Sequence, residues 1–342
     1  MATNRDYISA LLDQYEPRFR DAFMRAVDNL RDGADVAAVA EAIERNDLRG
    51  ALAAMNLAPE AFAVLDQMIT EAYVAGGNAT VGQLPKMQNA DGLRMVVRFD
   101  ARNVRAEEWL RVHSSELITA ILADQREAIR TALEEGMRQG LNPRTVARDI
   151  VGRFDAKTQR RMGGIIGLTG QQERFAANAL AELLSGDPDQ LRAYLGRARR
   201  DKRFDPIVNR AIRDEKPVGR EDADRMIMRY RDRLLALRGE TIARTEALAS
   251  LHQSQYEALQ QTVDSGAVQR DQVKRIWRSA SDRKVRDTHI ALDGQTTTLD
   301  GQFKSPSGAQ LRFPGDPLAP AAETINCRCW VEPKIDFLKG VR

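Results

Sequence analysis

The chain has 342 residues, is 43% hydrophobic, 30% charged and 6% aromatic, and carries a formal net charge of +3. This length suffices for two or three domains that fold without metal or disulfides, and this composition excludes global disorder. No run approaches the roughly 18 apolar residues of a membrane-spanning helix, and the first residues lack the apolar stretch of a signal peptide, so we expect a cytoplasmic product without a membrane partner.

The N-terminal region has the spacing of amphipathic helices. Apolar residues recur every three or four positions over 8–30, which predicts a first helix with a break or kink at Pro17. Alanine-rich segments at 36–45 and 59–74 predict two more helices, and Gly76-Gly77 is expected to end the second of them. This region is therefore expected to be helical between its turns.

The middle of the chain contains the two longest predicted helices. One apolar face covers 110–137, and a second helix is expected from about 222 to 262. Between them, Asn142-Pro143 has the pattern of an N-cap followed by a first-turn proline. Thr169 and Gln172 have the spacing of a capping box, in which each side chain bonds a free backbone N–H of the first turn.

After Gly266 the apolar period changes to that of strands. Residues 273–277 alternate like a strand with one buried face, and 282–292 are expected to form a short helix. Three further segments favour short strands: 295–299, 310–313 and 327–331. A small, loop-rich sheet with one short helix is the natural assembly of these elements.

The predicted fold is mainly α with a C-terminal α+β domain. A polar stretch at 78–92, expected to be a linker or an exposed loop, and the change of period after the last long helix give the two boundaries. We therefore expect a multi-helix N-terminal region at 1–90, a long-helix middle region at 91–262, and the small α+β domain at 263–342.

His289, Cys327 and Cys329 are residues of the types that bind zinc, and Asp316 is a candidate neighbour. On a strand, residues two apart point to one side, but their Cβ atoms lie roughly 7 Å apart, whereas two thiolates on one zinc need about 3.7 Å. A bulge or tight turn at Arg328 would have to close that gap. We therefore favour cysteines that pack as small hydrophobes beside a hydrogen-bonded histidine over a Zn²⁺ site, and expect no cofactor.

An arginine, a histidine and a glutamate could also cleave a phosphodiester without metal. Arg286 and His289 are one helical turn apart, and Glu323 is a candidate partner, with histidine as base or acid and arginine on the developing charge. A helix anchored by arginine–carboxylate pairs is the favoured interpretation. Because a P-loop, a GxGxxG after a strand, HExxH and GxSxG are all missing from the sequence, we expect a non-enzymatic protein without a small-molecule substrate.

The densest basic patch lies in the polar segment between the long helices. Arginine forks suit phosphate, so this patch is a candidate for contact with double-stranded DNA. Interspersed acids, Asp201 and Asp205, favour instead a solvated charged face. The basic residues are Arg197, Arg199, Arg200, Lys202 and Arg203.

The C-terminal third resembles the head-morphogenesis family typified by the minor head protein F of bacteriophage Mu. The resemblance rests on the order and spacing of short motifs. They are Ala243-Arg244-Thr245-Glu246, Trp277, Asp282-Arg283, Arg286, His289, Leu292-Asp293-Gly294, Phe303, Pro314-Gly315-Asp316-Pro317, Glu323 and Ile325-Asn326-Cys327-Arg328-Cys329. Upstream, Arg98-Phe99-Asp100, Trp109, His113 and Gly167-Leu168-Thr169 resemble the helical part of the family more loosely.

The resemblance implies a minor head protein of a tailed bacteriophage or prophage. Such a protein acts in head morphogenesis and in DNA packaging or delivery, at the portal vertex or in the capsid interior. Its implied partners are the portal protein, the major capsid or scaffold protein, and packaged double-stranded DNA. Its implied location is the virion head, with the host cytoplasm during assembly. A nuclease-like phosphodiesterase and a structural zinc module remain the alternatives for the C-terminal domain.

Overall fold

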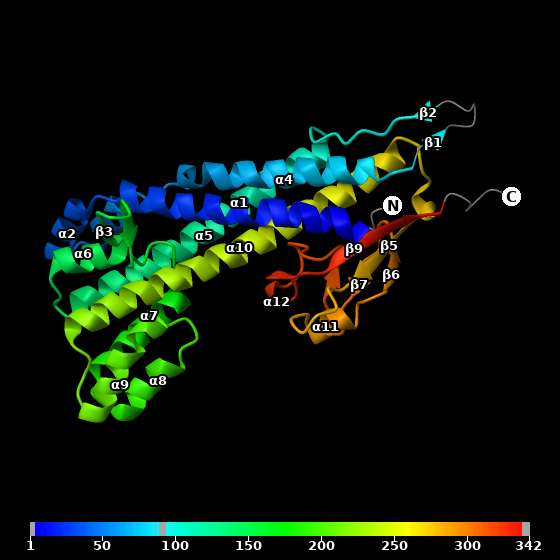
Figure 1. Cartoon of the computed structure of the whole chain (residues 1–342). Helices are drawn as coiled ribbons and strands as arrows, with labels where there is room; N and C mark the ends of the chain where they lie inside the picture. The colour runs from blue at the N-terminus through cyan, green and yellow to red at the C-terminus, as the bar shows by residue number, and fades with distance from the viewer. Residues whose placement is uncertain (1–3, 86, 89–93, 337–342) are drawn as a thin grey trace. The chain divides into compact units, whose positions relative to one another are not determined.

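A computed structural model describes residues 4–85, 87–88 and 94–336 of the chain (Figure 1). Contacts divide the chain into two compact units. Unit 1 consists of Met1–Phe23, Val64–Glu116 and Glu240–Arg342, and unit 2 of Met24–Ala63 and Leu117–Gly239. These units do not coincide with the expected segments 1–90, 91–262 and 263–342. The division of the chain into those three domains stays a prediction.

Three long helices contribute residues to both units. They are α1 (Asn4–Gly33), α5 (Val104–Arg138) and α10 (Arg220–Asp264). The long helices predicted at 110–137 and 222–262 are thereby confirmed. The break predicted at Pro17 is wrong, because α1 continues through this residue. Tyr15 and Phe19, on either side of the proline, are both buried, and their packing offsets the cost of a proline inside a helix.

In unit 1, α4 (Ala63–Gly82) follows the short helix η1 (Pro59–Phe62) of unit 2. The predicted end of this helix at Gly76-Gly77 is wrong. A Cβ atom on Gly76 would lie 2.3 Å from the Oγ atom of Ser254, and one on Gly77 would lie 2.3 Å from the ring of Phe99. These glycines therefore allow close packing inside the helix and do not terminate it.

Unit 2 is helical apart from one short hairpin. The two predicted helix starts are confirmed: Asn142 caps α6 through the N–H groups of Arg144 and Thr145, and Thr169 and Gln172 form a capping box on α7. The remaining elements are α2 (Val36–Glu44), α3 (Leu48–Ala54), α6 (Pro143–Val151), β3 (Arg153–Asp155), β4 (Arg160–Met162), α7 (Gly170–Leu184), α8 (Pro188–Gly196), η2 (Lys202–Phe204) and α9 (Asp205–Asp214).

The C-terminal part of unit 1 is an α+β module with a three-stranded antiparallel sheet of order β6-β5-β9 (Figure 1). The sheet pairs Trp277 with Val331 and Ile276 with Thr296. A two-stranded ribbon joins β7 to β8. The elements are η3 (Arg270–Gln272), β5 (Val273–Arg278), α11 (Asp287–Ile290), β6 (Thr296–Thr298), β7 (Phe303–Lys304), β8 (Gln310–Leu311), α12 (Ala321–Thr324) and β9 (Trp330–Ile335). A further pair, β1 (Met87–Gln88) and β2 (Arg94–Met95), precedes α5.

The core of this module is apolar and includes both cysteines. Its buried members are Leu248, Trp277, Leu292, Phe303, Leu311, Phe313, Cys327, Cys329 and Val331. Since Leu248 belongs to α10, the sheet packs on the C-terminal part of that helix. The predicted mainly α fold with a C-terminal α+β module is confirmed. Among the described residues, every helix is too short or too polar to cross a bilayer.

Two predicted elements of the module differ from the structure. The helix expected at 282–292 is confined to α11, because Lys284 and Val285 take part in a turn that Asp282 caps. The strand expected at 327–331 begins only at Trp330. In both places turn chemistry ends the regular element that the apolar spacing alone would extend.

Candidate functional site

The side chains of His289, Cys327 and Cys329 converge in the core of the α+β module. The Nδ1 atom of His289 lies 3.4 Å from the Sγ atom of Cys327 and 3.5 Å from that of Cys329. All three residues are at most 2% exposed. Their ligand atoms lie within 4.8 Å of one another, which defines what we call the Cys-His cluster.

Local backbone geometry brings the two sulfur atoms together. Asn326 adopts a left-handed conformation with φ of 56°, and the chain then passes through Cys327 and Cys329 before β9 begins. The backbone N–H of Cys329 donates to the Sγ atom of Cys327 over 3.5 Å. The cysteines therefore precede the strand, and the separation of about 7 Å for i and i+2 on a strand does not apply to them.

Glu323 lies on the far side of the His289 ring. Its Oε2 atom is 2.8 Å from Nε2, an ion-pair distance, although the angle at the ring nitrogen is not that of an aligned hydrogen bond. Ser305, Ser307 and Thr288 each donate a hydroxyl to this carboxylate, over 3.1, 2.5 and 3.1 Å. Burial would raise the pKa of Glu323, but these donors and His289 hold the pKa below its usual value.

The two thiols have unequal proton affinities. A hydrogen bond from Cys329 lowers the pKa of Cys327 well below its usual range, and His289 adds to the effect. The interaction with Cys327, together with burial, raises the pKa of Cys329. The hydrogen bond between the two thiols therefore moves their pKa values in opposite directions.

Aromatic side chains cover the His289 side of the cluster. The Trp277 ring packs edge-on against the His289 ring with centroids 5.1 Å apart, and Phe303 packs edge-on against Trp277 at 5.2 Å. Trp277 and Phe303 are fully buried. With His289 only 1% exposed, the geometry offers a phosphodiester no open approach to the imidazole.

Two other predicted site residues are engaged elsewhere. The guanidinium of Arg286 donates to the carbonyl of Ile325. Asp316 is buried and pairs with Arg312 at 2.6 Å, and it also accepts the backbone N–H of Leu318. Among the described residues, the group of candidate metal ligands at His289 does not include Asp316. Of the predicted ligands and catalytic residues, His289, Cys327, Cys329 and Glu323 are the ones brought together.

The predicted basic patch is largely neutralised by acids of its own unit. Arg197 pairs with Glu182 at 2.6 Å, Arg200 with Asp205 at 2.9 Å, and Arg203 with Asp201 at 2.6 Å. Arg199 and Lys202 are exposed. Three of the five basic side chains are thus already held in ion pairs. Contact of this patch with DNA stays a prediction.

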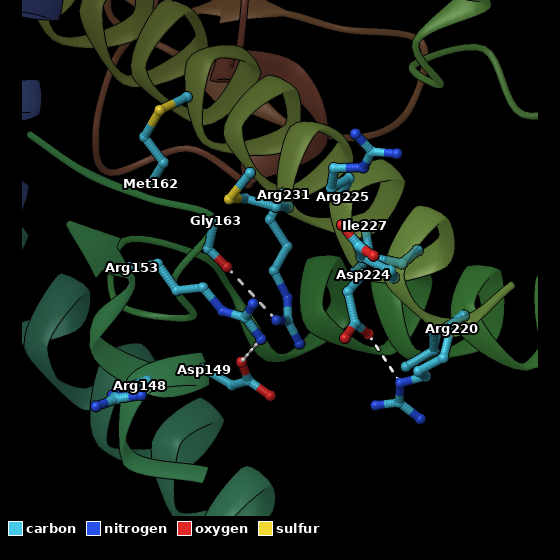
Figure 2. A pocket seen from close by; sticks show the side chains of 13 residues that line it. Arg148, Asp149, Arg153, Met162, Gly163, Arg220, Asp224, Arg225, Ile227 and Arg231 are labelled. Carbon is cyan, nitrogen blue, oxygen red and sulfur yellow. Dashed lines mark hydrogen bonds and ion pairs between the residues drawn. The ribbon is translucent and has the colours of Figure 1, made fainter. Parts of the chain in front are cut away.

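A second arginine-rich site lies in unit 2 and was not predicted from the sequence. It is a pocket of about 230 Å³, with side chains from α6 and β3 on one side and from α10 on the other (Figure 2). The two sides of the pocket are some seventy residues apart in the sequence, and only folding brings them together. A search for dense local runs of basic residues therefore does not find this site. Five arginines and three acids line it, namely Arg148, Arg153, Arg220, Arg225, Arg231, Asp149, Glu221 and Asp224.

Ion pairs fix part of this pocket. Arg153 lies 3.5 Å from Asp149, and Arg220 lies 3.0 Å from Asp224. Arg231 pairs with Glu173 and donates to the carbonyl of Gly163 over 3.5 Å (Figure 2). Arg225 also pairs with Asp222, so four of the five lining arginines are held in ion pairs. The further N–H donors of these guanidinium groups suit an anionic group such as phosphate.

Comparison with known proteins identifies the C-terminal third. Residues 219–332 match the family described as "Phage Mu protein F like protein". The "Uncharacterized protein YqbB" of Bacillus subtilis (strain 168) is 35% identical over 102 residues, which cover 29% of this chain and 31% of that protein. No solved structure matches the chain. The resemblance to the Mu F-like family is thereby confirmed for the segment that contains the Cys-His cluster and Glu323.

Proposed function

Because residues 219–332 form a Mu protein F-like module, we propose that the chain is a minor head protein of a tailed bacteriophage or prophage. The family match carries this proposal. It covers all of α10 and nearly all of the α+β module, including His289, Cys327 and Cys329 of the Cys-His cluster. The proposed role is head morphogenesis with DNA packaging or delivery, at the portal vertex or capsid interior, and the proposed location is the virion head after assembly in the host cytoplasm.

The proposed partners are the portal protein and the major capsid or scaffold protein. Exposed apolar side chains outside the matched segment support a docking role for the helical regions, since such side chains are favourable to bury against a partner. Val104 is 80% exposed and Phe154 is 58% exposed. A change of these residues to serine is expected to weaken capture of portal or capsid protein without unfolding the chain.

Packaged double-stranded DNA is the third proposed partner. The arginine-lined pocket of Figure 2 supports contact with phosphate, because five arginines and three acids line it. The expected contact is with the backbone and independent of base sequence. The chain is proposed to act without catalysis, as the closed surroundings of His289 support.

The deciding experiment deletes the gene from a phage that encodes the protein and complements it in trans. Loss of infectious, DNA-filled heads, restored by the complementing chain, is the expected result. A pull-down of purified portal or capsid protein by the full chain is the biochemical arm. Normal DNA-filled heads after deletion, together with no capture of either partner, would contradict the proposal.

A further inference from the structure

We propose that His289, Cys327 and Cys329 bind one zinc ion, which fastens the α+β module together. This inference concerns the chemistry of the module and does not depend on its role in the phage head. Thiolate sulfur and imidazole nitrogen are the ligands that zinc prefers in structural sites. Here three such atoms converge in an apolar core, within 4.8 Å of one another.

The distances match those around a shared ion. In a tetrahedral site with Zn–S near 2.3 Å and Zn–N near 2.0–2.1 Å, sulfur and nitrogen lie about 3.6 Å apart. The two observed separations from His289 Nδ1 are 3.4 and 3.5 Å. An unprotonated imidazole nitrogen has one in-plane lone pair. A single ion placed between the three atoms would take that lone pair and satisfy both distances.

Glu323 occupies the position of a carboxylate that orients a metal-binding histidine. Such carboxylates accept the second ring N–H, fix the tautomer and make the ligating nitrogen more basic. The 2.8 Å contact at Nε2 leaves Nδ1 as the nitrogen that faces the sulfur atoms. Ser305, Ser307 and Thr288 hold the carboxylate in turn. These contacts hold the imidazole in one orientation, with Nδ1 towards the sulfur atoms. Apolar packing of the ring alone would not require a carboxylate fixed by three hydroxyl groups.

An approach to the cluster exists within unit 1. A pocket of about 160 Å³ is lined by Cys329 together with Ala280 and Arg328 of the module and Asp13 and Glu16 of α1. Three protein ligands leave one zinc position for a water or another small ligand. The pocket therefore offers a small ion or ligand a route to the Cys329 side of the cluster. Asp13 and Glu16 in its lining are balanced by Arg244 and Arg328, so the charge of the lining is neutral.

The first test needs no variant. The full chain, purified untagged under reducing conditions, is expected to contain one equivalent of zinc by elemental analysis. After removal of zinc with a chelator, added Co²⁺ is expected to give the visible absorption bands of a tetrahedral site with thiolate ligands, and added Zn²⁺ should abolish them. The melting temperature should fall by several degrees on chelation and recover with zinc.

Variants then locate the ion. Cys327→Ser and Cys329→Ser are each expected to lose the cobalt–thiolate bands, and circular dichroism of the same samples reports whether the helices remain folded. His113→Gln, in α5, is the matched histidine control and should bind zinc like the unaltered chain. A zinc-free chain whose melting does not respond to chelator, and which gives no cobalt spectrum, would overturn the proposal. So would equal zinc content in the cysteine variants, or a Cys327–Cys329 disulfide found by mass spectrometry in the purified chain.

Discussion

Oε2 of Glu323 lies 2.8 Å from Nε2 of His289, and both residues are buried. The pair connects α11 to α12, two short helices from different parts of the module's sequence. The carboxylate keeps the opposite ring nitrogen directed at the two sulfur atoms. Glu323 thus acts on the cluster through the histidine, as a positioning residue.

Glu323→Gln tests that role. The amide keeps the size of the side chain but loses the charge that strengthens the histidine as a ligand. We expect zinc still to bind at one equivalent, with affinity lowered by about 10–100-fold. Competition with a chromophoric chelator measures this change. Unchanged zinc affinity would show that Glu323 only packs.

The proposal that the chain is not a nuclease makes a second prediction. Because His289 is 1% exposed and Arg286 is bound to a backbone carbonyl, purified protein should leave single- and double-stranded DNA and RNA intact, with or without divalent metal. Gel assays with end-labelled substrates check this. Cleavage by the unaltered chain that disappears in His289→Ala would establish the phosphodiesterase alternative.

His252 gives a pH dependence of stability. It lies in α10 against Phe313, is fully buried, and neither ring nitrogen has an aligned hydrogen-bond partner among the described residues. Burial lowers the pKa of His252 to about 4, from 6.5 in the unfolded chain. Between these values the unfolded state binds the proton and the folded state does not, so stability is full above about pH 6.5 and falls as the pH drops towards 4.

The size of this effect follows from the shift. From pH 6.5 to 5 the His252 contribution should fall by on the order of 2 kcal/mol. Urea unfolding at both pH values measures it, and His252→Gln, which cannot be protonated, is the control. An equal pH slope in the two proteins would assign the acid sensitivity to other groups.

The arginine-lined pocket predicts how DNA binding responds to salt. Arg148→Ala combined with Arg153→Ala should weaken binding to any duplex sequence and reduce the slope of log K against log salt by about 2. Fluorescence anisotropy with a short duplex at several salt concentrations measures the slope. Arg199→Ala with Lys202→Ala, which alters the exposed residues of the predicted patch, is the matched pair. If the Arg199/Lys202 double variant lowered the slope and the Arg148/Arg153 double variant did not, the DNA contact would be assigned to the Arg197–Arg203 patch.

The glycines of α4 predict a packing effect. Gly76→Ala should destabilise unit 1 by about 1–3 kcal/mol, because its Cβ would meet the side chain and backbone of α10 near Ser254 and Leu251. Gly82 lies in the same helix with nothing within 4 Å of a built Cβ. Gly82→Ala should therefore be neutral or slightly stabilising. Thermal unfolding of the two variants compares them, and equal destabilisation would argue against close helix packing as the cause.

Local signals predicted the long helices at 110–137 and 222–262, the caps of α6 and α7, and the strand at 273–277, since these depend on apolar period and on side chains two or three residues apart. The prediction at Gly76-Gly77 failed for a different reason from those at 282–292 and 327–331. These glycines were expected to end a helix, but Ser254 and Phe99, which pack against them, come from other segments of the chain. Such tertiary packing leaves no local trace in the sequence.

The candidate site likewise has parts that could be predicted from the sequence and parts that could not. The chemical types in the Cys-His cluster and the involvement of Glu323 could be inferred from the sequence. The distance argument against a shared ion assumed a strand at Cys327, whereas the left-handed Asn326 places both cysteines before the strand. A single backbone dihedral therefore decided whether the sulfur atoms could meet. The pocket of Figure 2 could not be foreseen, because its two sides are far apart in the sequence.

The boundaries of α10 have a practical consequence for dissecting the protein. The family match begins at residue 219, and α10 begins at Arg220, yet residues up to Gly239 belong to unit 2. Met226, Ile227, Leu234 and Leu235 of that stretch are buried. A fragment cut at the limits of the match would expose this apolar face to water. The segment that the family match covers is therefore not a self-contained folding unit, and helical segments from elsewhere in the chain must accompany it.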